Sequence, residues 1–349
     1  EHIIISNWFT SRRFQPWFFL VALKAFILSI ARLFQSQADI YHAHDLMALP
    51  ACYIVAKLRR KPLIFETYEL HFPVPETSIA FWRPLGGLLM RLLGVLLPRC
   101  QGVIAASPLY AQEFRKLYHL SEVITIRNIP PYKAVEKNDR LRQYLGFSPE
   151  TRIALYQGSI QHVRGLDRLV RAAAFLEPDI VIILMGKSYG TIQTELEALI
   201  VGEGVADRVK IIPPVPYEEL LAWTASADIG LTIFPPENSL SISMSQPNKL
   251  FEYLMAGLPV LSSQLRAVEE IIRAYDVGEI VTLVEPEAIG AAINAMMAHD
   301  TTLHRMSHNA LEAAKNDLNW EKESLQLIGL YEDIVVRLRK IGGVHCNIH

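Results

Sequence analysis

The amino-acid sequence predicts an α/β protein made of two tandem, doubly wound domains. Short apolar strand patterns alternate with helical patterns along the chain, which is typical of βαβ units and a parallel sheet. The alternation stops in a polar stretch, residues 133–150, and then begins again. A length of 349 residues with 51% hydrophobic and 20% charged residues is sufficient for two separate cores.

Composition limits the classes of function. The 34 Lys and Arg residues against 36 Asp and Glu residues give a net charge of −2, so no global field draws the protein onto nucleic acid. The three cysteines are far apart and form no CxxC pair, which favours a reducing, cytoplasmic compartment. Because the chain begins with Glu1 and enters directly with a strand pattern, we expect an N-terminal piece to be missing.

The first half of the chain contains four predicted strands joined by helices. The strands are predicted over 38–45, 62–65, 102–106 and 123–126, and the helices over 46–58 and 107–117. In a parallel sheet, ligands bind at the carboxyl ends of the strands, so polar residues there are site candidates. These residues are His42, His44, Asp45, Glu66, Tyr68, Glu69, Ser107 and Asn128.

Two apolar stretches of the first half also carry basic residues. Polar and basic residues interrupt 17–34, which therefore falls short of the ~20 apolar residues of a membrane span. We expect a helix there that is buried or rests on a membrane surface. Residues 81–99 combine leucines with three arginines at helical spacing, a pattern of either a helix on an anionic membrane or an ordinary core helix.

The second half repeats the alternation of strands and helices. Residues 133–150 are interpreted as a linker with a leading helix of the second domain. The later strands are predicted over 153–156, 181–184, 209–212 and 229–233, and the helices over 165–175, 191–201 and 217–225. This alternation repeats the βαβ theme of the first half and predicts a second doubly wound domain.

The stretch 245–263 predicts a loop, a short helix and a buried strand. Pro247 suits the first helical position, and a Gly-Leu-Pro run stops the helix. Glu252 lies four residues after Asn248 and three after Lys249, so these side chains share one helix face. A cation and a carboxylate are thereby held beside a helix N-terminus, which attracts phosphate. A solvated Lys–Glu pair is the alternative.

A second candidate anion site follows the strand over 153–156. Gly158 and Gly165 bracket a turn in which bare backbone and Arg164 can hold a diphosphate. No G-x-G-x-x-G fingerprint follows a predicted strand, which argues against a nicotinamide dehydrogenase.

His42 and His44 lie two residues apart on a predicted strand, so their side chains face the same way, as metal ligands can. Leu46 stands where the HxHxDH pattern of metallo-hydrolases would continue, and no further His or Cys cluster supplies ligands. We therefore predict no metal site, and we expect His44 and Asp45 to face the cleft. Residues 345–349 carry further ligand types and are interpreted as a frayed terminus.

Motifs along nearly the whole chain, taken in order, resemble the retaining glycosyltransferases of family 4. Their order and spacing carry the resemblance. The motifs are Tyr41-His-Ala-His-Asp45, Glu66-Thr-Tyr-Glu-Leu70, Ala105-Ala-Ser107, Arg127-Asn128, Gln157-Gly158 with Arg164-Gly165, Ala227-Asp-Ile-Gly230, Pro247-Asn-Lys-Leu-Phe-Glu-Tyr-Leu-Met-Ala-Gly-Leu-Pro259, and the C-terminal Leu318-Asn-Trp320 with 327–331.

This resemblance implies a GT-B fold, in which two Rossmann-like domains face each other across a cleft. Residues 1–143 would form the acceptor-side domain, without its first strand and glycine-rich loop. Residues 144–318 would bind the nucleotide-sugar, and 319–340 would form a helix that returns to the first domain. The implied reaction transfers a sugar, with retention, from a nucleotide-diphosphate donor to a glycan or lipid-linked acceptor at the cytoplasmic membrane face, with no metal or other cofactor.

The family's functional residues can be carried over onto matching positions. Glu252 matches the second glutamate of the E-x7-E motif, which is expected to hold the ribose hydroxyls. Arg164 matches the basic residue that neutralises the diphosphate, and Tyr68 completes the predicted catalytic set. The predicted donor-binding residues are Gly158, Ser159, Arg164, Gly186, Asn248, Lys249 and Glu252, and the predicted acceptor-side residues are His44, Asp45 and Glu69.

Three positions depart from the family pattern. Met244 replaces the first glutamate of E-x7-E, Ser159 stands where an arginine is frequent, and Tyr68 stands where many members have a histidine. Two alternatives therefore stay open beside the transferase: a nucleotide-sugar 2-epimerase of the same architecture, and a non-catalytic glycosyltransferase-like subunit.

Overall fold

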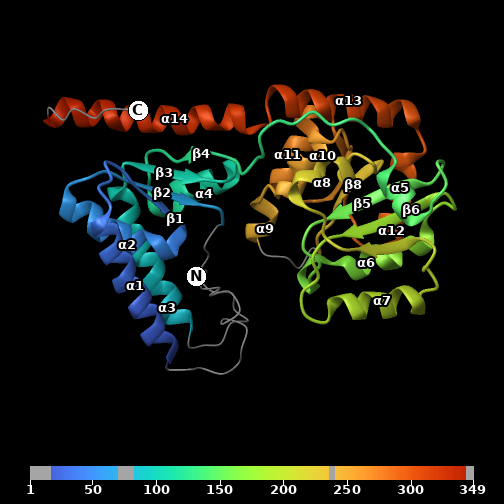
Figure 1. Ribbon diagram of the computed structural model, residues 1–349, viewed down its shortest axis with the longest axis horizontal. Coiled ribbons are helices and arrows are strands. Elements are labelled where there is room, and N and C mark those ends of the chain that lie inside the picture. Colours follow the sequence, from blue (N-terminus) through green and yellow to red (C-terminus); the bar gives the residue numbers. More distant parts are fainter. Residues whose placement is uncertain (1–16, 70–81, 236–239, 343–349) are drawn as a thin grey trace.

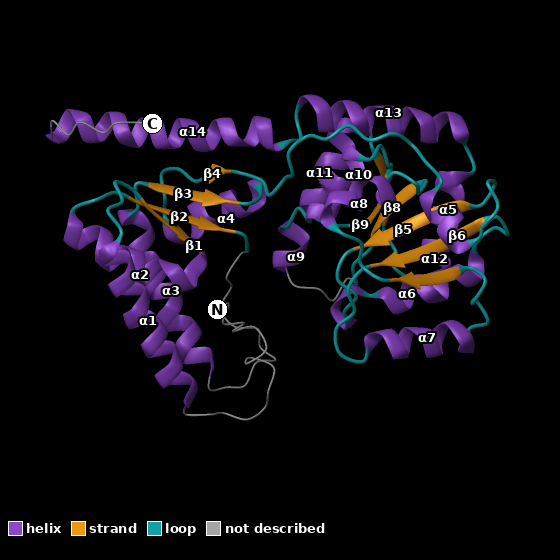
Figure 2. Cartoon of the chain, viewed as in Figure 1, coloured by secondary structure: helices purple, strands orange, loops and turns teal. Residues whose placement is uncertain are grey.

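The computed structural model describes residues 17–69, 82–235 and 240–342, and within them the chain forms two parallel β-sheets flanked by helices (Figures 1 and 2). The first sheet has the strand order β1-β2-β3-β4, and the second has the order β10-β9-β8-β5-β6-β7. Neighbouring strands of both sheets run parallel. The predicted α/β class with two parallel-sheet domains is therefore confirmed.

The first sheet and the helices around it come from the first part of the chain. Their bounds are α1 Trp17–Gln35, β1 Tyr41–His44, α2 Asp45–Arg59, β2 Leu63–Thr67, α3 Trp82–Leu96, β3 Gly102–Ala105, α4 Pro108–Tyr118 and β4 Ile124–Thr125. The strand pattern at the start of the chain and residues 345–349 lie outside the described residues.

The second sheet and its helices follow. Their bounds are α5 Arg140–Leu145, β5 Arg152–Gln157, α6 Leu166–Ala172, β6 Ile180–Met185, α7 Ile192–Gly202, β7 Val209–Ile212, α8 Tyr217–Thr224, β8 Ile229–Thr232, α9 Leu240–Met244, α10 Asn248–Met255, β9 Val260–Ser263, α11 Arg266–Tyr275, β10 Gly278–Val281, α12 Pro286–Met297, α13 Asp300–Asn316 and α14 Trp320–Gly342.

The predicted domain boundaries stay predictions. Helix α5 crosses the first of them, after residue 143, and its Leu141 packs in the core of the second sheet. The helix belongs with the second domain in its packing, because the buried Arg142 guanidinium also binds Asp228, with 2.6 Å between Nη2 and Oδ2.

The side chains of β1 point alternately to the two faces of the first sheet, and the two faces pack against different helices. Tyr41 and Ala43 are buried in the cluster formed with α2, α3 and α4, whereas His42 and His44 point to the other face. On that second face, Leu330 and Ile334 of α14 pack in a cluster with strand residues of the sheet. The last helix, which follows the second domain in sequence, thus lies along the first sheet, as Figure 1 shows.

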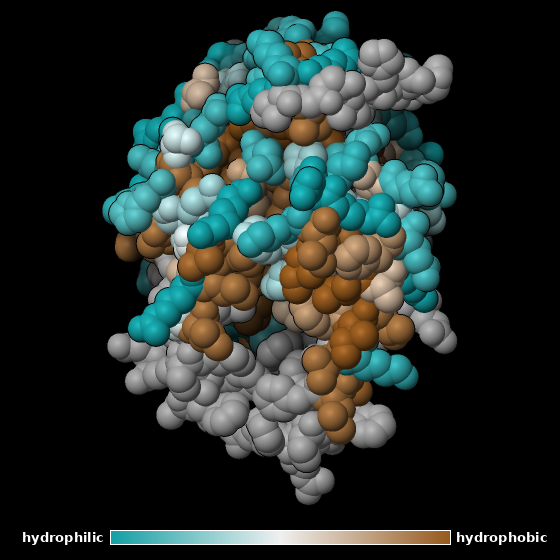
Figure 3. All heavy atoms as spheres, turned by 90° about the vertical axis from the view of Figure 1, so that its left-hand side faces the viewer, coloured by the Kyte–Doolittle hydropathy of each residue, from teal (hydrophilic) through white to brown (hydrophobic). Residues whose placement is uncertain are grey.

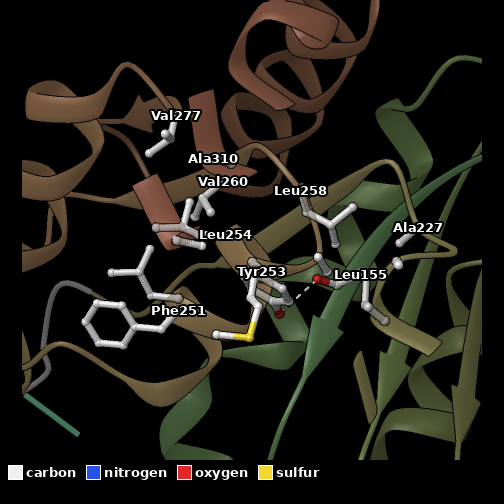
Figure 4. Packing of buried hydrophobic residues seen from close by; sticks show 14 of the residues in the cluster. Leu155, Ala227, Phe251, Tyr253, Leu254, Leu258, Val260, Val277 and Ala310 are labelled. Carbon is white, nitrogen blue, oxygen red and sulfur yellow. Dashed lines mark hydrogen bonds between the residues drawn. The ribbon is translucent and has the colours of Figure 1, made fainter. Parts of the chain in front are cut away.

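Helix α10 is positioned by its buried face. Leu250, Phe251 and Leu254 are fully buried, and Tyr253 is buried beside them (Figure 4). The Tyr253 hydroxyl donates to the Leu155 carbonyl of β5 at 3.0 Å, which attaches α10 to the centre of the sheet. Burying this face leaves the polar side of the helix directed away from the core.

The predicted helix start needs a small correction. Pro247 is the N-cap residue with extended backbone angles, and the helix begins at Asn248. The Pro247 carbonyl accepts the first hydrogen bond of the helix, from the Leu250 N–H at 2.9 Å. A proline loses nothing at this position, since the N-cap N–H takes no part in the helix.

Direct contacts join the two domains at α9. Ser107, the N-cap of α4, donates its hydroxyl to the Met244 carbonyl at 2.6 Å. The Tyr110 hydroxyl donates to the Ser241 carbonyl at 2.8 Å. The Met244 side chain is buried within the hydrophobic cluster of the first domain. A short segment of the second domain therefore completes the core of the first.

Within the described ranges, none of the helices combines the length and the apolar content that crossing a membrane requires.

Candidate functional site

A pocket of about 470 Å³ opens at the carboxyl end of β5 in the second sheet. Strand order reverses here: the chain runs from β5 outward to β7, and then returns to β8 on the other side of β5. Such a switch point is where open α/β sheets bind ligands. All seven predicted donor-binding residues line this pocket, namely Gly158, Ser159, Arg164, Gly186, Asn248, Lys249 and Glu252.

Two glycines, Gly158 and Gly186, bring bare backbone to the lining of the pocket. Gly158 and Gly186 have φ values of +128° and +157°, in the region that favours glycine. The Gly158 N–H donates to the Met185 carbonyl at 3.0 Å, so the loops that follow β5 and β6 touch directly. A Cβ on Gly186 would lie 1.8 Å from the Gly158 carbonyl oxygen. The close approach of these loops requires glycine at residue 186.

Replacing Gly186 with alanine is expected to lower the free energy of unfolding by about 3 kcal/mol, since backbone must move to admit the methyl group. Gly190→Ala is the matched control: Gly190 also has a positive φ, of +67°, but a Cβ there meets nothing within 4 Å. The control should lose only the ~1 kcal/mol of backbone strain. Urea denaturation of the three proteins measures both values, and equal losses would contradict the proposed clash.

Lys249 lines this pocket, and its amine nitrogen is buried. Its ammonium nitrogen lies 3.6 Å from the centroid of the Tyr156 ring and has no hydrogen-bond partner among the described residues. Burial, and then the nearby Arg164 charge, lower the pKa of Lys249 well below its ordinary value, against the opposing effect of Glu252. The attraction between cation and ring compensates part of the cost of burial.

Glu252 is held by a chain of hydrogen bonds from inside the domain. Gln157 Nε2 donates to Glu252 Oε2 at 2.5 Å, and Thr224 Oγ1 donates to Gln157 Oε1 at 2.6 Å. Burial raises the pKa of Glu252, while the bond from Gln157 and the charge of Lys249 lower it, and the net shift is upward. The alternative of a solvated Lys–Glu pair does not hold, because the amine nitrogen of Lys249 is buried and the Glu252 carboxylate is hydrogen-bonded to Gln157.

Arg164 ends a short 3-10 turn, residues 162–164, between β5 and α6. Its guanidinium carbon lies 5.2 Å from the centroid of the Phe234 ring, and its buried Nε has no hydrogen-bond partner among the described residues. Buried donors of this kind are almost always satisfied in folded proteins. Arg164 and Lys249 thus bring two cationic groups with unused donor atoms to one pocket, as an anionic ligand would require.

The remaining predicted site residues lie on the first domain, outside the pocket. The Tyr68 hydroxyl is 3.3 Å from His44 Nδ1, and Tyr68 is predicted to be catalytic. Burial and the neighbouring Glu66 carboxylate raise the pKa of Tyr68. Asp45 begins α2 with a φ of +65°, and Glu69 accepts a hydrogen bond at its carbonyl from Thr67 Oγ1 at 2.8 Å. The roles of these residues stay predictions.

Glu66 joins His42 and His44 into a cluster that the sequence did not predict. Its Oε2 lies 3.0 Å from His42 Nε2 and 3.3 Å from His44 Nδ1. Burial would raise the pKa of Glu66, but contacts with His42, Tyr68 and His44 outweigh it, and the pKa is lowered.

Several residues that shape the pocket were not predicted to take part. Gln157 donates a hydrogen bond that positions Glu252, and Thr224 orients Gln157 in turn. The Tyr156 ring packs against the Lys249 ammonium. One sequence feature could have indicated the part played by Tyr156 and Gln157: they end a strand in the middle of the sheet, directly before Gly158.

The fold and this pocket define a two-domain protein of GT-B architecture with an anion-suited pocket on the second domain. The chain belongs to the family "Glycosyl transferases group 1", whose family model matches residues 137–313. A second model, "Glycosyltransferase Family 4", matches residues 2–129. The resemblance to family 4 glycosyltransferases is therefore confirmed.

Individual relatives agree with this family. A D-inositol 3-phosphate glycosyltransferase of Xylanimonas cellulosilytica is 27% identical over 199 residues, which are 56% of this chain and 46% of the relative. D-inositol 3-phosphate glycosyltransferase 1 of Catenulispora acidiphila is 22% identical over 318 residues, 85% of this chain and 72% of the relative. The match thus spans about half of the first relative's length.

Solved structures share the architecture. Anabaena HepE, crystallised with UDP and glucose, superimposes with a TM-score of 0.70 at 20% identity, covering 87% of this chain and 81% of HepE. Sucrose-phosphate synthase of Thermosynechococcus elongatus gives a TM-score of 0.73 at 18% identity, covering 91% of this chain and 79% of the synthase. The predicted GT-B fold is confirmed by these neighbours.

Proposed function

We propose that this protein is a glycosyltransferase that takes a sugar from a nucleotide-diphosphate donor bound in the pocket at the end of β5. The observation that carries the proposal is the pair of basic side chains, Arg164 and Lys249, each of which has a buried donor atom without a hydrogen-bond partner among the described residues. A nucleoside diphosphate supplies the negative charge that this pair can neutralise. The names of the relatives and the UDP in the Anabaena structure support the same donor class.

The chemistry follows from where charge develops. As the bond between sugar and diphosphate breaks, negative charge gathers on the leaving phosphate oxygens. Fixed cations and the N-terminus of α10 interact more strongly with this charge in the transition state than with the donor in the ground state, and this difference lowers the barrier. The oxocarbenium-like sugar then accepts the acceptor hydroxyl on the face from which phosphate departs, and a phosphate oxygen takes the proton. With two cations in place, we propose that donor cleavage needs no metal.

The Glu252 carboxylate is proposed to accept hydrogen bonds from the ribose hydroxyls. It borders a second pocket of about 380 Å³, which is also lined by Asn248 and by residues of the segment that connects the two domains. Asn248 Oδ1 accepts a hydrogen bond from Asn128 Nδ2 of the first domain at 3.2 Å. The nucleoside end of a donor would therefore lie where the two domains meet.

We further propose that the acceptor is a glycan or lipid-linked glycan reached at the inner face of the cytoplasmic membrane. Helices α1 and α3 contain no Asp or Glu, and both contain basic residues. Six of their apolar side chains are between 50% and 64% exposed, namely Leu20, Leu23, Ile27, Leu28, Leu88 and Val95. Figure 3 shows hydrophobic side chains gathered over the lower part of this face. Apolar and cationic groups together suit an anionic lipid surface.

Donor turnover tests the proposed function. The protein would be incubated with UDP-, GDP- and ADP-sugars, with and without a lipid-linked glycan extract, and the products separated by chromatography. Transfer that depends on the acceptor supports the transferase. Interconversion of donors without acceptor would support the 2-epimerase, and absence of binding to all three nucleoside diphosphates would support the non-catalytic subunit.

The affinity for a nucleoside diphosphate is expected to fall as the pH rises. A bound anion raises the pKa of Lys249, so binding takes up a proton wherever the free amine is neutral. Burial places the pKa of Lys249 in the ligand-free protein well below the ordinary lysine value. The affinity therefore begins to fall at a pH below the usual range of lysine titration. It stops falling above the pKa of Lys249 in the complex. One proton corresponds to about tenfold in affinity per pH unit within this window.

Calorimetry of UDP binding measures this dependence above the pH at which the diphosphate itself is fully ionised. Lys249→Met should bind weakly with no pH dependence, and Lys249→Arg should keep a cation at every pH. A wild-type affinity that stays constant with pH, or a Lys249→Met variant that keeps the slope, would contradict the assignment to Lys249.

Association with anionic vesicles is expected to depend on the exposed side of α1. Ile27→Glu places a carboxylate among the apolar residues and should weaken binding to phosphatidylglycerol vesicles by about tenfold or more. Val201→Glu is the matched control, since Val201 is an exposed apolar residue on α7 of the second domain. Sedimentation with vesicles measures both. Equal binding by the two variants, or no binding by the wild type, would contradict the membrane contact.

A further inference from the structure

Three side chains of types that bind metals meet at the carboxyl end of the first sheet. His42, His44 and Glu66 each offer one ligand atom, and these atoms all lie within 4.8 Å of one another. Glu66 Oε2 is the central atom, 3.0 Å from His42 Nε2 and 3.3 Å from His44 Nδ1. This cluster is on the first domain, and none of its members lines the pocket that contains Arg164 and Lys249.

The pairing of two neighbouring strands produces this cluster. His44 of β1 is the register partner of Glu66 of β2, so the two side chains project from the same face. His42 lies two residues earlier on β1 and shares that face. The three residues are therefore fixed by the backbone of a sheet rather than by a loop, as a precise ligand set requires.

The separations suit a small transition-metal ion. Nitrogen and carboxylate ligands lie about 2.0–2.2 Å from zinc, and tetrahedral geometry then places ligand atoms about 3.3–3.5 Å apart. The two measured contacts of 3.0 Å and 3.3 Å need only small adjustments to reach this range. Two imidazoles and a carboxylate are a known donor set for zinc, and they leave a fourth position for water or another oxygen ligand.

The orientation of His42 gives independent support. His42 Nδ1 lies 2.8 Å from the Tyr331 hydroxyl of α14, which directs the other ring nitrogen, Nε2, toward Glu66. That Nε2 atom is buried and makes no hydrogen bond of acceptable geometry, although Glu66 Oε2 is close. Metal-bound histidines characteristically have the second ring nitrogen hydrogen-bonded in this way. Nearly parallel stacking of the two imidazoles, 4.4 Å apart, further restricts their orientation.

We propose that the protein binds one divalent transition-metal ion of the zinc type through His42, His44 and Glu66, with Tyr331 as the residue that orients His42. The ion is separate from the donor diphosphate, whose charge Arg164 and Lys249 neutralise. Its coordination would join β1 and β2 and, through the Tyr331 hydroxyl, secure α14 on the first sheet. The alternative, an ion pair between Glu66 and a histidinium, is an outcome of the test.

The test is titration of the metal-stripped full-length chain with Zn²⁺ by calorimetry, beside Co²⁺ absorption spectra. We expect one ion per chain, and cobalt d–d bands without the charge-transfer band of a thiolate ligand. His44→Ala should abolish this binding, and because His44 is 56% exposed its removal leaves the core intact. His162→Ala is the matched control, as His162 is a similarly exposed histidine 3.5 Å from a carboxylate, that of Glu195.

Two further variants test the orienting role of Tyr331 and the part played by the C-terminal residues. Tyr331→Phe should weaken Zn²⁺ binding by about 10–100-fold, the usual effect of losing an orienting partner. A chain that ends at Gly342 lacks His345, Cys346 and His349, and it should bind as the full chain does. Absence of a bound ion, binding unchanged in His44→Ala, or binding lost on removal of residues 343–349 would each overturn the proposal and leave the ion pair.

Discussion

Replacing Arg164 with alanine is expected to lower kcat for donor cleavage by about 10²–10³-fold, with a smaller change in KM. The guanidinium lies on the pocket wall with an unused donor atom, so its contribution grows as charge develops on the leaving diphosphate. An effect on kcat distinguishes this role from simple binding of the donor. Initial rates over a range of donor concentrations give both constants.

Arg171→Ala provides the matched control for this substitution. Arg171 lies on α6, seven residues further along, and its guanidinium is paired with Glu203 at the surface. The control should retain wild-type turnover, because surface ion pairs contribute little. A similar loss in both variants would point to general destabilisation, and an unaffected Arg164→Ala would remove Arg164 from the catalytic set.

Replacing Glu252 with glutamine is expected to weaken binding of a nucleoside diphosphate by about 10–100-fold, the value of one or more hydrogen bonds to a charged group. The carboxylate is already oriented by Gln157, so little ordering is needed when ribose binds. Removing its charge also leaves Lys249 without the neighbour that raises its pKa. Calorimetry with UDP, GDP and ADP measures the change for each base.

A 2′,3′-dideoxy analogue shows whether the ribose is the group recognised. The wild type should prefer the natural nucleotide, and Glu252→Gln should bind the two alike. Glu219→Gln is the matched control, since Glu219 lies on α8 and pairs with Arg140 at the surface. Discrimination that persists in Glu252→Gln would assign the ribose to another residue.

The pocket at the end of β5 could be predicted largely from sequence because its residues belong to short local motifs. Gly158 and Gly186 follow apolar strands directly, and helical spacing brings Asn248, Lys249 and Glu252 to one side of α10. Sequence did not predict that the amine nitrogen of Lys249 is buried. That property depends on the Tyr156 ring, which the sheet places against Lys249 from nearly a hundred residues away.

The cluster of the first sheet could not be predicted for a related reason. The sequence placed His42, His44 and Glu66 among the polar residues at strand ends, but that Glu66 contacts both histidines follows only from the register of β1 with β2. Tyr331 comes from 289 residues further along the chain. Helix α9 was also missed, since five residues are too few to show a helical period.

Met244 has a consequence for how this sequence can change. The family resemblance predicts a glutamate at this position, but the Met244 side chain is buried in the core of the other domain and its carbonyl accepts a hydrogen bond from the Ser107 hydroxyl. Glutamate at this position would bury an unpaired carboxylate among apolar side chains. Such a substitution would be tolerated only together with compensating changes in the first domain, so the residues on the two sides of this contact constrain each other.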